Sequence, residues 1–134
     1  MNKRLVLRLV LPVLIILLLA ACTRAPILTV EPSEFDFGDI SAAAPVSATL
    51  QVRNQGNRAL TISDISTSCG CTTAAVTQST VAAGQTTDLQ VTFDPQAHPG
   101  LYGPLLRIVY LQSNDPDHPE VEVPITVNIL EDSQ

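Results

Sequence analysis

Tryptophan is absent from the 134-residue sequence, and basic residues are scarce after the first eight positions. Without tryptophan, the chain lacks the Cys…Trp…Cys pattern of true immunoglobulin domains. Residues 22–134 hold four basic residues against thirteen acidic ones, a formal charge of −9. A surface this acidic repels phosphate groups, which argues against nucleic acid as a partner and against membrane binding through surface charge. The length is that of one domain.

The motifs of common enzyme classes are also missing. The sequence contains no Gly-x-Ser-x-Gly nucleophile motif and no glycine-rich phosphate loop. Its two histidines, His98 and His118, lie in proline-containing segments without an evident carboxylate to orient them. We therefore expect a protein that is not an enzyme and that uses no cofactor.

A short apolar run follows three basic residues at the N-terminus. Residues 9–21 are apolar without a break. Thirteen helical residues rise about 20 Å, less than the roughly 30 Å of a membrane's hydrocarbon core. A basic segment, a short apolar segment and small residues in this order are typical of a secretory signal. A transmembrane anchor or an uncleaved signal is the alternative.

The end of this run resembles the lipobox of bacterial lipoproteins. The residues are Leu19-Ala20-Ala21-Cys22. In that family the signal is cleaved before the cysteine, which is then acylated. The resemblance implies a signal peptide at residues 1–21, a membrane anchor on Cys22 and a tether through residue 27. Thr23, where aspartate would retain a protein at the inner membrane, implies the outer membrane facing the periplasm, with the cell surface also open.

The rest of the chain alternates apolar and polar residues with a period of two, which predicts β-strands. The pattern covers residues 46–53, 89–93 and 121–129, and turn signals separate the runs. Residues 105–111 are apolar on both faces except for Arg107, which predicts a more buried strand. Pro124 lacks a backbone donor, so we expect an edge strand or a bulge there. About seven strands predict an immunoglobulin-like antiparallel β-sandwich over residues 28–130, with a tail at 131–134.

Several short motifs along this chain resemble a widespread bacterial domain of unknown function that carries an SCGCT signature. That family is similar to the ASH domains of ciliary and centrosomal proteins and, more distantly, to major-sperm-protein folds. The resemblance implies the fold and a binding role, but no established activity. One departure is Ala83, where the family usually has proline. The motifs are Phe35-Asp36-Phe37-Gly38-Asp39-Ile40, Asn54-Gln55-Gly56, Leu60-Thr61-Ile62, Ser68-Cys69-Gly70-Cys71-Thr72 and Ser113-Asn114-Asp115-Pro116.

Cys69 and Cys71 are the strongest candidates for chemistry, because free thiols in an exported protein need a reason. In one interpretation they form a disulfide, with Gly70 supplying unusual backbone angles. Such a short loop would add only about 1.6 kcal/mol of stability, so local rigidity or redox lability would be its use. In a second interpretation they bind Cu(I), helped by His98 or His118. In a third they are buried and inert.

Three further features have a mainly structural interpretation. The oxygen-rich segment after Ser113 resembles a calcium loop only loosely, and local hydrogen bonding in a turn is the favoured explanation. Phe35 and Phe37 lie two apart and would share one strand face in the core. Tyr102, between two glycines, is a candidate exposed contact residue. The carboxylates of the acidic segment are Asp115, Asp117 and Glu120, with Asn114 beside them.

These observations together predict a lipid-anchored envelope protein that acts as a non-catalytic protein-binding module. Its partner would be another envelope protein, bound through a loop or an exposed strand edge. The alternative is copper or thiol-redox handling through Cys69-Gly70-Cys71. A passive structural role in the envelope is a third hypothesis. Nothing in the sequence identifies the partner.

Overall fold

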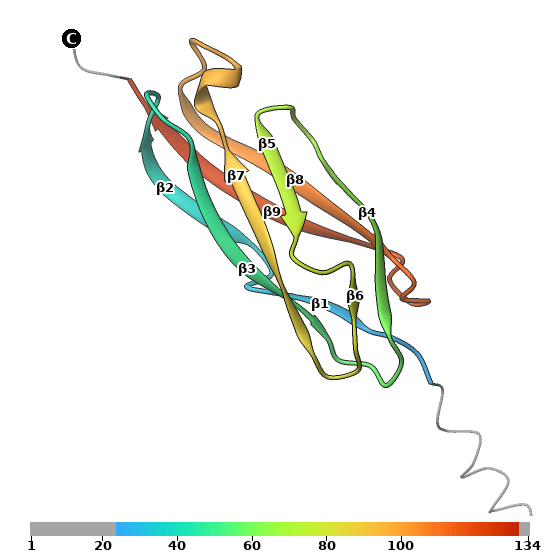
Figure 1. Cartoon of the computed structure of the whole chain (residues 1–134). Helices are drawn as coiled ribbons and strands as arrows, with labels where there is room; N and C mark the ends of the chain where they lie inside the picture. Colours follow the sequence, from blue (N-terminus) through green and yellow to red (C-terminus); the bar gives the residue numbers. More distant parts are fainter. Residues whose placement is uncertain (1–23, 132–134) are drawn as a thin grey trace, which may run out of the picture.

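The computed structural model describes residues 24–131, which fold into two β-sheets packed face to face (Figure 1). One sheet has the strand order β1-β3-β7-β5 and the other β2-β9-β8-β4-β6. The predicted immunoglobulin-like sandwich is therefore confirmed. The elements are β1 Leu28–Glu31, β2 Phe35–Ser41, β3 Val46–Asn54, β4 Leu60–Thr67, β5 Thr72–Val76, β6 Thr80–Val81, β7 Thr86–Phe93, the 3-10 helix η1 Pro95–Ala97, β8 Gly103–Ser113 and β9 Glu120–Leu130.

The described residues differ from the prediction in strand number and in one pairing. They form nine strands rather than about seven. The additional strands are short: β6 has two residues, too few for an alternating pattern to show. In addition, β2 runs parallel to β9, whereas an antiparallel sandwich was expected. Parallel pairing joins segments far apart in the sequence, so no local turn signal announces it.

Alternating residues of both sheets form the core. Leu50, Leu89 and Val91 are at most 1% exposed, as the period-two pattern requires. Burying each such side chain stabilises the fold by about 1.5–3 kcal/mol. A smaller cluster lies around Phe93 and includes Cys71. The cysteine turn is thus tied to a packed part of the sandwich.

Strand β8 is not buried on both faces, contrary to the prediction. Val109 and Leu111 are fully buried, but Leu106 is 55% exposed. The reason is that β8 lies inside its sheet, and the other sheet covers only one face of it. Ile108 and Tyr110, on the same outer face as Leu106, are only partly buried.

Pro124 is also placed differently from the expectation. It lies in β9, between β2 and β8, and the β8–β9 register runs through it without a bulge. Its partner Ile108 directs its own N–H and C=O toward Ser68, away from β9. The proline nitrogen therefore faces the β2 side, where pairing begins only at Ile125. A missing donor there costs no ladder hydrogen bond.

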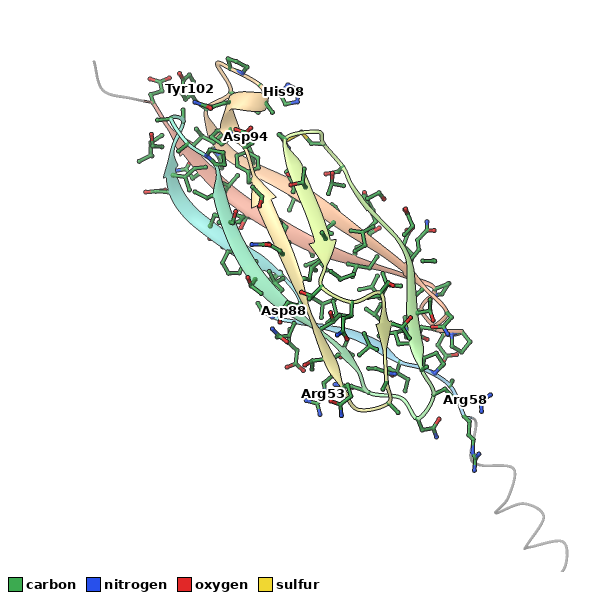
Figure 2. The ribbon with its side chains drawn as sticks, viewed as in Figure 1. Arg53, Arg58, Asp88, Asp94, His98 and Tyr102 are labelled. Atoms are coloured by element: carbon green, nitrogen blue, oxygen red, sulfur yellow. A yellow bond between two sulfur atoms is a disulfide. The ribbon has the colours of Figure 1, made fainter. Side chains whose placement is uncertain are left out.

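The two motif turns at one end of the sandwich hold the start of the described chain. Asn54 Oδ1 accepts the Ile27 N–H at 3.3 Å, and Asp115 Oδ2 accepts the Leu28 N–H at 2.9 Å. Gly56 lies so close to this segment that an added Cβ would be 2.7 Å from the Ile27 nitrogen. Arg53 and Arg58 mark this end in Figure 2, while His98 and Tyr102 lie at the opposite end. No helix within residues 24–131 is long and apolar enough to cross a membrane.

Candidate functional site

The Cys69–Cys71 pair lies in the turn between β4 and β5, where the chain crosses from one sheet to the other. The two sulfurs are joined by a disulfide, with Cα atoms 5.2 Å apart. The Thr67 hydroxyl donates to the carbonyls of Cys69 at 2.9 Å and Thr72 at 2.8 Å. The N–H of Asp94 donates to the Cys71 carbonyl at 2.7 Å. Thr67 and Asp94 thus fix the backbone of the pair.

The two sulfurs have unequal surroundings. Cys71 is 2% exposed and packs in the cluster of Phe93, Val127 and Ile129. Cys69 is only partly buried at the margin of that cluster. Its sulfur accepts a hydrogen bond from the Cys71 N–H at 3.1 Å. One sulfur therefore faces the core and the other lies nearer the surface.

Arg107 contacts the buried sulfur. Its Nε donates to Cys71 Sγ at 3.2 Å, and its Nη1 donates to the Leu106 carbonyl at 2.8 Å. The sequence signal for this contact was present, because Arg107 is the single charge in an otherwise apolar strand. Its role went unpredicted because the partner sulfur lies 36 positions away in sequence.

His98 joins the cysteines at a shallow surface depression, whereas His118 does not. One ring nitrogen of His98 and the two sulfurs lie within 4.8 Å of one another. Asp94 positions the loop by capping η1, its carboxylate accepting the Gln96 N–H at 2.9 Å. His118 lies at the opposite end, so the suggestion that it assists the cysteines is wrong. The depression is lined by Ser68, Cys69, Gly70, His98, Pro99, Gly100, Leu101 and Arg107.

The donor set of this cluster suits a soft metal ion when the disulfide is reduced. Two thiolates and an imidazole are ligands that Cu(I) accepts. Within residues 24–131 this is the one group of cysteines, histidines and carboxylates close enough to hold a metal. In the disulfide form the sulfurs are bonded to each other, which leaves His98 as the remaining donor.

Gly70 does not adopt the unusual backbone conformation that was expected of it. The glycines with positive φ are Gly38, Gly84, Gly100 and Gly103. A Cβ added at Gly70 would meet no atom within 4 Å. The space beside the disulfide is therefore open toward solvent, and the turn does not require glycine for its backbone angles.

The acidic segment after β8 is a hydrogen-bonded turn. Asp115 is 1% exposed, and its carboxylate accepts the N–H groups of Leu28, Asp117 and His118. Burial alone would raise the pKa of Asp115, but these three hydrogen bonds lower it below its ordinary value of 3.8, and the charge of His118 lowers it further. Because these backbone donors use both carboxylate oxygens, the geometry supports the turn rather than a calcium loop.

The aromatic candidates lie away from the cysteine site. Phe35 and Phe37 stack edge to face with centroids 5.0 Å apart, and both pack partly buried against the core. This agrees with the structural role expected for them. Tyr102 is 44% exposed at the end of the sandwich that carries His98 (Figure 2). Cys22 lies outside the described residues, so its acylation stays a prediction.

Comparison with known proteins identifies the family. The sequence profile of the family described as "Protein of unknown function (DUF1573)" matches residues 28–129. The chain belongs to this family. Among curated proteins, none matches its sequence.

Solved structures show the same fold. A protein of unknown function from Porphyromonas gingivalis superimposes with a TM-score of 0.72 at 21% identity, over 81% of this chain and 50% of that one. The ASH/PapD-like domain 7 of human CEP192 gives 0.65 at 8%, over 84% and 92%. SSP-19, an MSP-domain-like protein of Caenorhabditis elegans, gives 0.53 at 19%, over 75% and 99%. The likeness to ASH and MSP domains is confirmed for the fold, and this chain spans half the Porphyromonas protein.

Proposed function

We propose that this chain is a lipid-anchored envelope protein that binds another protein without catalysis, by adding a strand of the partner to the edge of β5. The structural relatives support the immunoglobulin-like fold, whose sheets end in open edges. The observation that carries the proposal is that β5 is an edge strand without the features that normally protect such edges.

The four edge strands of the described sandwich differ in protection. β1 ends in Glu31 and is followed by proline. β2 carries two aspartates, and its register shifts between Asp36 and Asp39. β6 has only two residues. By contrast, β5 reads Thr-Thr-Ala-Ala-Val, with neither charge nor proline. Charge, proline, bulges and shortness all hinder edge-to-edge pairing, so β5 is the most open of the four outermost strands.

The hydrogen-bond register shows which groups β5 offers. The Cys71 carbonyl accepts the N–H of Asp94, the residue after β7, and the Thr77 N–H donates to Asp88 of β7. Odd-numbered residues of β5 therefore direct their backbone groups to β7. The N–H and C=O groups of Ala74 and Val76 consequently face away from the sheet. The Thr72 carbonyl on the same side is already bonded to the Thr67 hydroxyl. Strand addition is therefore centred on Ala74 and Val76.

The chemistry of β5 indicates the kind of partner. Its outward side chains, Thr73 and Ala75, are small, which lets another backbone approach closely. Because backbone hydrogen bonds dominate strand addition, the partner is an extended protein segment of about five residues with modest sequence specificity. The formal charge of −9 favours a partner with a basic or neutral surface.

The anchor proposal gives this surface an orientation. Residues 24–28 lie at one end of the sandwich, and the Cys69 turn lies at the other (Figure 1). An acyl group on Cys22 would therefore leave the cysteine site, and the Thr72 end of β5 beside it, directed away from the membrane. Two or three acyl chains would hold the protein firmly, since each buried CH₂ contributes about 0.8 kcal/mol.

Site-specific photo-crosslinking in cells tests the binding surface. A photoreactive residue at Ala75 is compared with one at Thr49. Both face outward from one sheet, and both are in register with Gln90 of β7. Thr49 lies in β3, two strands away from β5, so it controls for crosslinking to the face of the sheet rather than to the β5 edge. We expect a crosslinked protein adduct from Ala75 and none from Thr49. Equal adducts from both positions, or none from Ala75, would contradict edge binding.

A further inference from the structure

The Cys69–Cys71 disulfide combines one accessible sulfur with one sheltered sulfur. Cys69 is partly buried at the surface depression, whereas Cys71 is 2% exposed. Gly70 has no side chain, and the space where one would lie is empty. A nucleophile must approach a disulfide roughly along the S–S axis, so the attack is directed at Cys69, and Cys71 becomes the leaving group.

The structure already provides for the charge that develops on the leaving sulfur. Arg107 Nε lies 3.2 Å from Cys71 Sγ and is directed at it by a second hydrogen bond, from Nη1 to the Leu106 carbonyl. A guanidinium keeps its charge at all physiological pH values and stabilises a neighbouring thiolate. The Cys71 N–H, which donates to Cys69 Sγ at 3.1 Å, offers similar help to the other sulfur.

We propose that this disulfide exchanges with the thiols of other proteins, that Cys69 is the sulfur attacked, and that Arg107 stabilises the departing Cys71 thiolate. A partner thiolate forms a bond to Cys69 Sγ while the S–S bond breaks, and its electron pair stays on Cys71. A second thiolate of the partner then attacks the partner's sulfur in the mixed disulfide, and Cys69 leaves as a thiolate. The partner dithiol is oxidised, the cysteine pair is reduced, and the two partner protons balance the two new thiolates.

The proposal goes beyond strand binding, because its test uses small thiols that need no strand edge. The first experiment compares two variants of the detergent-extracted full chain that each lose one cysteine of the pair, while Cys22 carries its proposed acyl group in both. Cys71→Ser leaves Cys69 free, and Cys69→Ser leaves Cys71 free. With oxidised glutathione as the probe, we expect mixed disulfide on Cys69 to form at least tenfold faster than on Cys71. Equal rates, or a faster Cys71, would overturn the assignment.

The second experiment measures the contribution of Arg107. We expect Arg107→Gln to slow disulfide opening by dithiothreitol about three- to tenfold, since a less stable thiolate leaves more slowly. Arg107→Lys should restore most of the rate. In the Cys69→Ser background, ultraviolet thiolate absorbance should show a higher Cys71 pKa with Arg107→Gln, because the guanidinium no longer stabilises the thiolate. Arg53→Gln, at the opposite end, is the matched control and should change neither value. An unchanged opening rate and pKa in Arg107→Gln would overturn the role of Arg107.

Metal binding is the competing use of the same sulfurs. Native mass spectrometry of the reduced chain with Cu(I), with and without His98→Gln, separates the two. If the disulfide exchanges as proposed, dithiothreitol should open it in His98→Gln at the wild-type rate. The reason is that His98 forms no hydrogen bond with either sulfur in the structure. A stoichiometric Cu(I) adduct that needs His98, in a protein whose disulfide resists dithiothreitol while folded, would overturn exchange and establish a metal site.

Discussion

The motif residues of this chain serve two different purposes, which separate at the two ends of the sandwich. Asn54 and Asp115 are buried and bond to the backbone of residues 27 and 28. Cys69 and Cys71 occupy the other end, in a turn that is open beside Gly70. The Asn54 and Asp115 motifs therefore have a structural role at one end, whereas the cysteine motif at the other end carries groups that can react.

Two glycines provide a direct contrast in stability. Gly56→Ala would place a Cβ 2.7 Å from Ile27 N and Pro26 Cα, in contact with backbone that cannot easily move. We expect it to lower the free energy of unfolding by about 1–3 kcal/mol. Gly70→Ala meets no atom within 4 Å, so its effect should be below about 0.5 kcal/mol. Urea denaturation of both variants checks the pair, and a larger loss in Gly70→Ala would contradict the turn geometry.

Asp115 makes the stability depend on pH. Its folded pKa is lowered from the ordinary value of 3.8 by backbone hydrogen bonds that outweigh burial. A carboxyl with a lowered folded pKa contributes stability that is fully present above its unfolded pKa and is lost as the pH falls through the folded pKa. Asp115→Asn should therefore cost about 1–3 kcal/mol at pH 7.

The same variant should flatten the acid limb of the stability profile. Denaturant midpoints measured between pH 2 and pH 7 check this for the wild type and for Asp115→Asn. The difference between the two proteins should shrink below about pH 4, as the unfolded wild-type carboxyl and then, at lower pH, the folded one take up a proton. A difference that stays constant down to pH 2 would show that the charge of Asp115 contributes nothing.

The sequence showed which residues are candidates for chemistry, but it did not show which of them lie in contact. The pairing of Cys69 with Cys71 was among the sequence hypotheses because the two lie two positions apart and are the only cysteines besides Cys22. The contacts of Arg107 and His98 were not predictable, because they depend on β8 and η1 folding back beside the β4–β5 turn. His118 and His98 look alike in sequence, and only the fold separates them.

Among the elements, β5 is the strand on which the proposed function depends. It has five residues and pairs only with β7 in the described part of the chain. Its side chains on the inner face, Ala74 and Val76, pack partly buried against the core. The strand is thus anchored by one face and one edge, and its second edge is open to a partner.

The register of β5 predicts unequal effects of proline at neighbouring positions. The Ala75 N–H faces β7, whereas the Ala74 N–H faces away from the sheet. Ala75→Pro should therefore remove a ladder hydrogen bond and cost about 1–3 kcal/mol. Ala74→Pro should cost less than half of that. Thermal or urea unfolding of the two variants checks the register, and a larger loss in Ala74→Pro would contradict it.

The strands that the sequence predicted are those with long alternating apolar patterns. Residues 46–53 and 121–129 alternate strictly and became β3 and β9. β5 and β6 were missed because threonine and alanine give little apolar contrast. The parallel β2–β9 pair and the central position of Pro124 depend on long-range pairing, which alternation alone does not encode.

At the scale of the whole molecule, the proposed anchor predicts a defined attachment. Cells grown with labelled palmitate should incorporate the label into the wild-type chain. Cys22→Ser should abolish incorporation and release the protein from the membrane fraction, because no other acylation site is proposed. Cys69→Ser is the matched cysteine control and should keep the label. Labelled Cys22→Ser protein, or unlabelled wild type, would contradict the anchor.

The two proposed activities share one region of the molecule. The Cys69 turn leads directly into β5, so a partner strand along β5 would lie next to the disulfide. Strand addition and disulfide exchange are nevertheless separable, since one depends on Ala74 and the other on Cys69 and Arg107. Variants at these positions therefore report on each activity by itself.

The most direct test of the central claim is photo-crosslinking at Ala75 in cells when the β5 edge is blocked. The photoreactive residue at position 75 is combined with Ala74→Pro, which removes an outward N–H, and with Ala74→Ser, which keeps it. Edge binding predicts a partner adduct with Ala74→Ser and a loss of most of that adduct with Ala74→Pro, at equal protein abundance. An adduct of equal yield in both variants would contradict strand addition to β5.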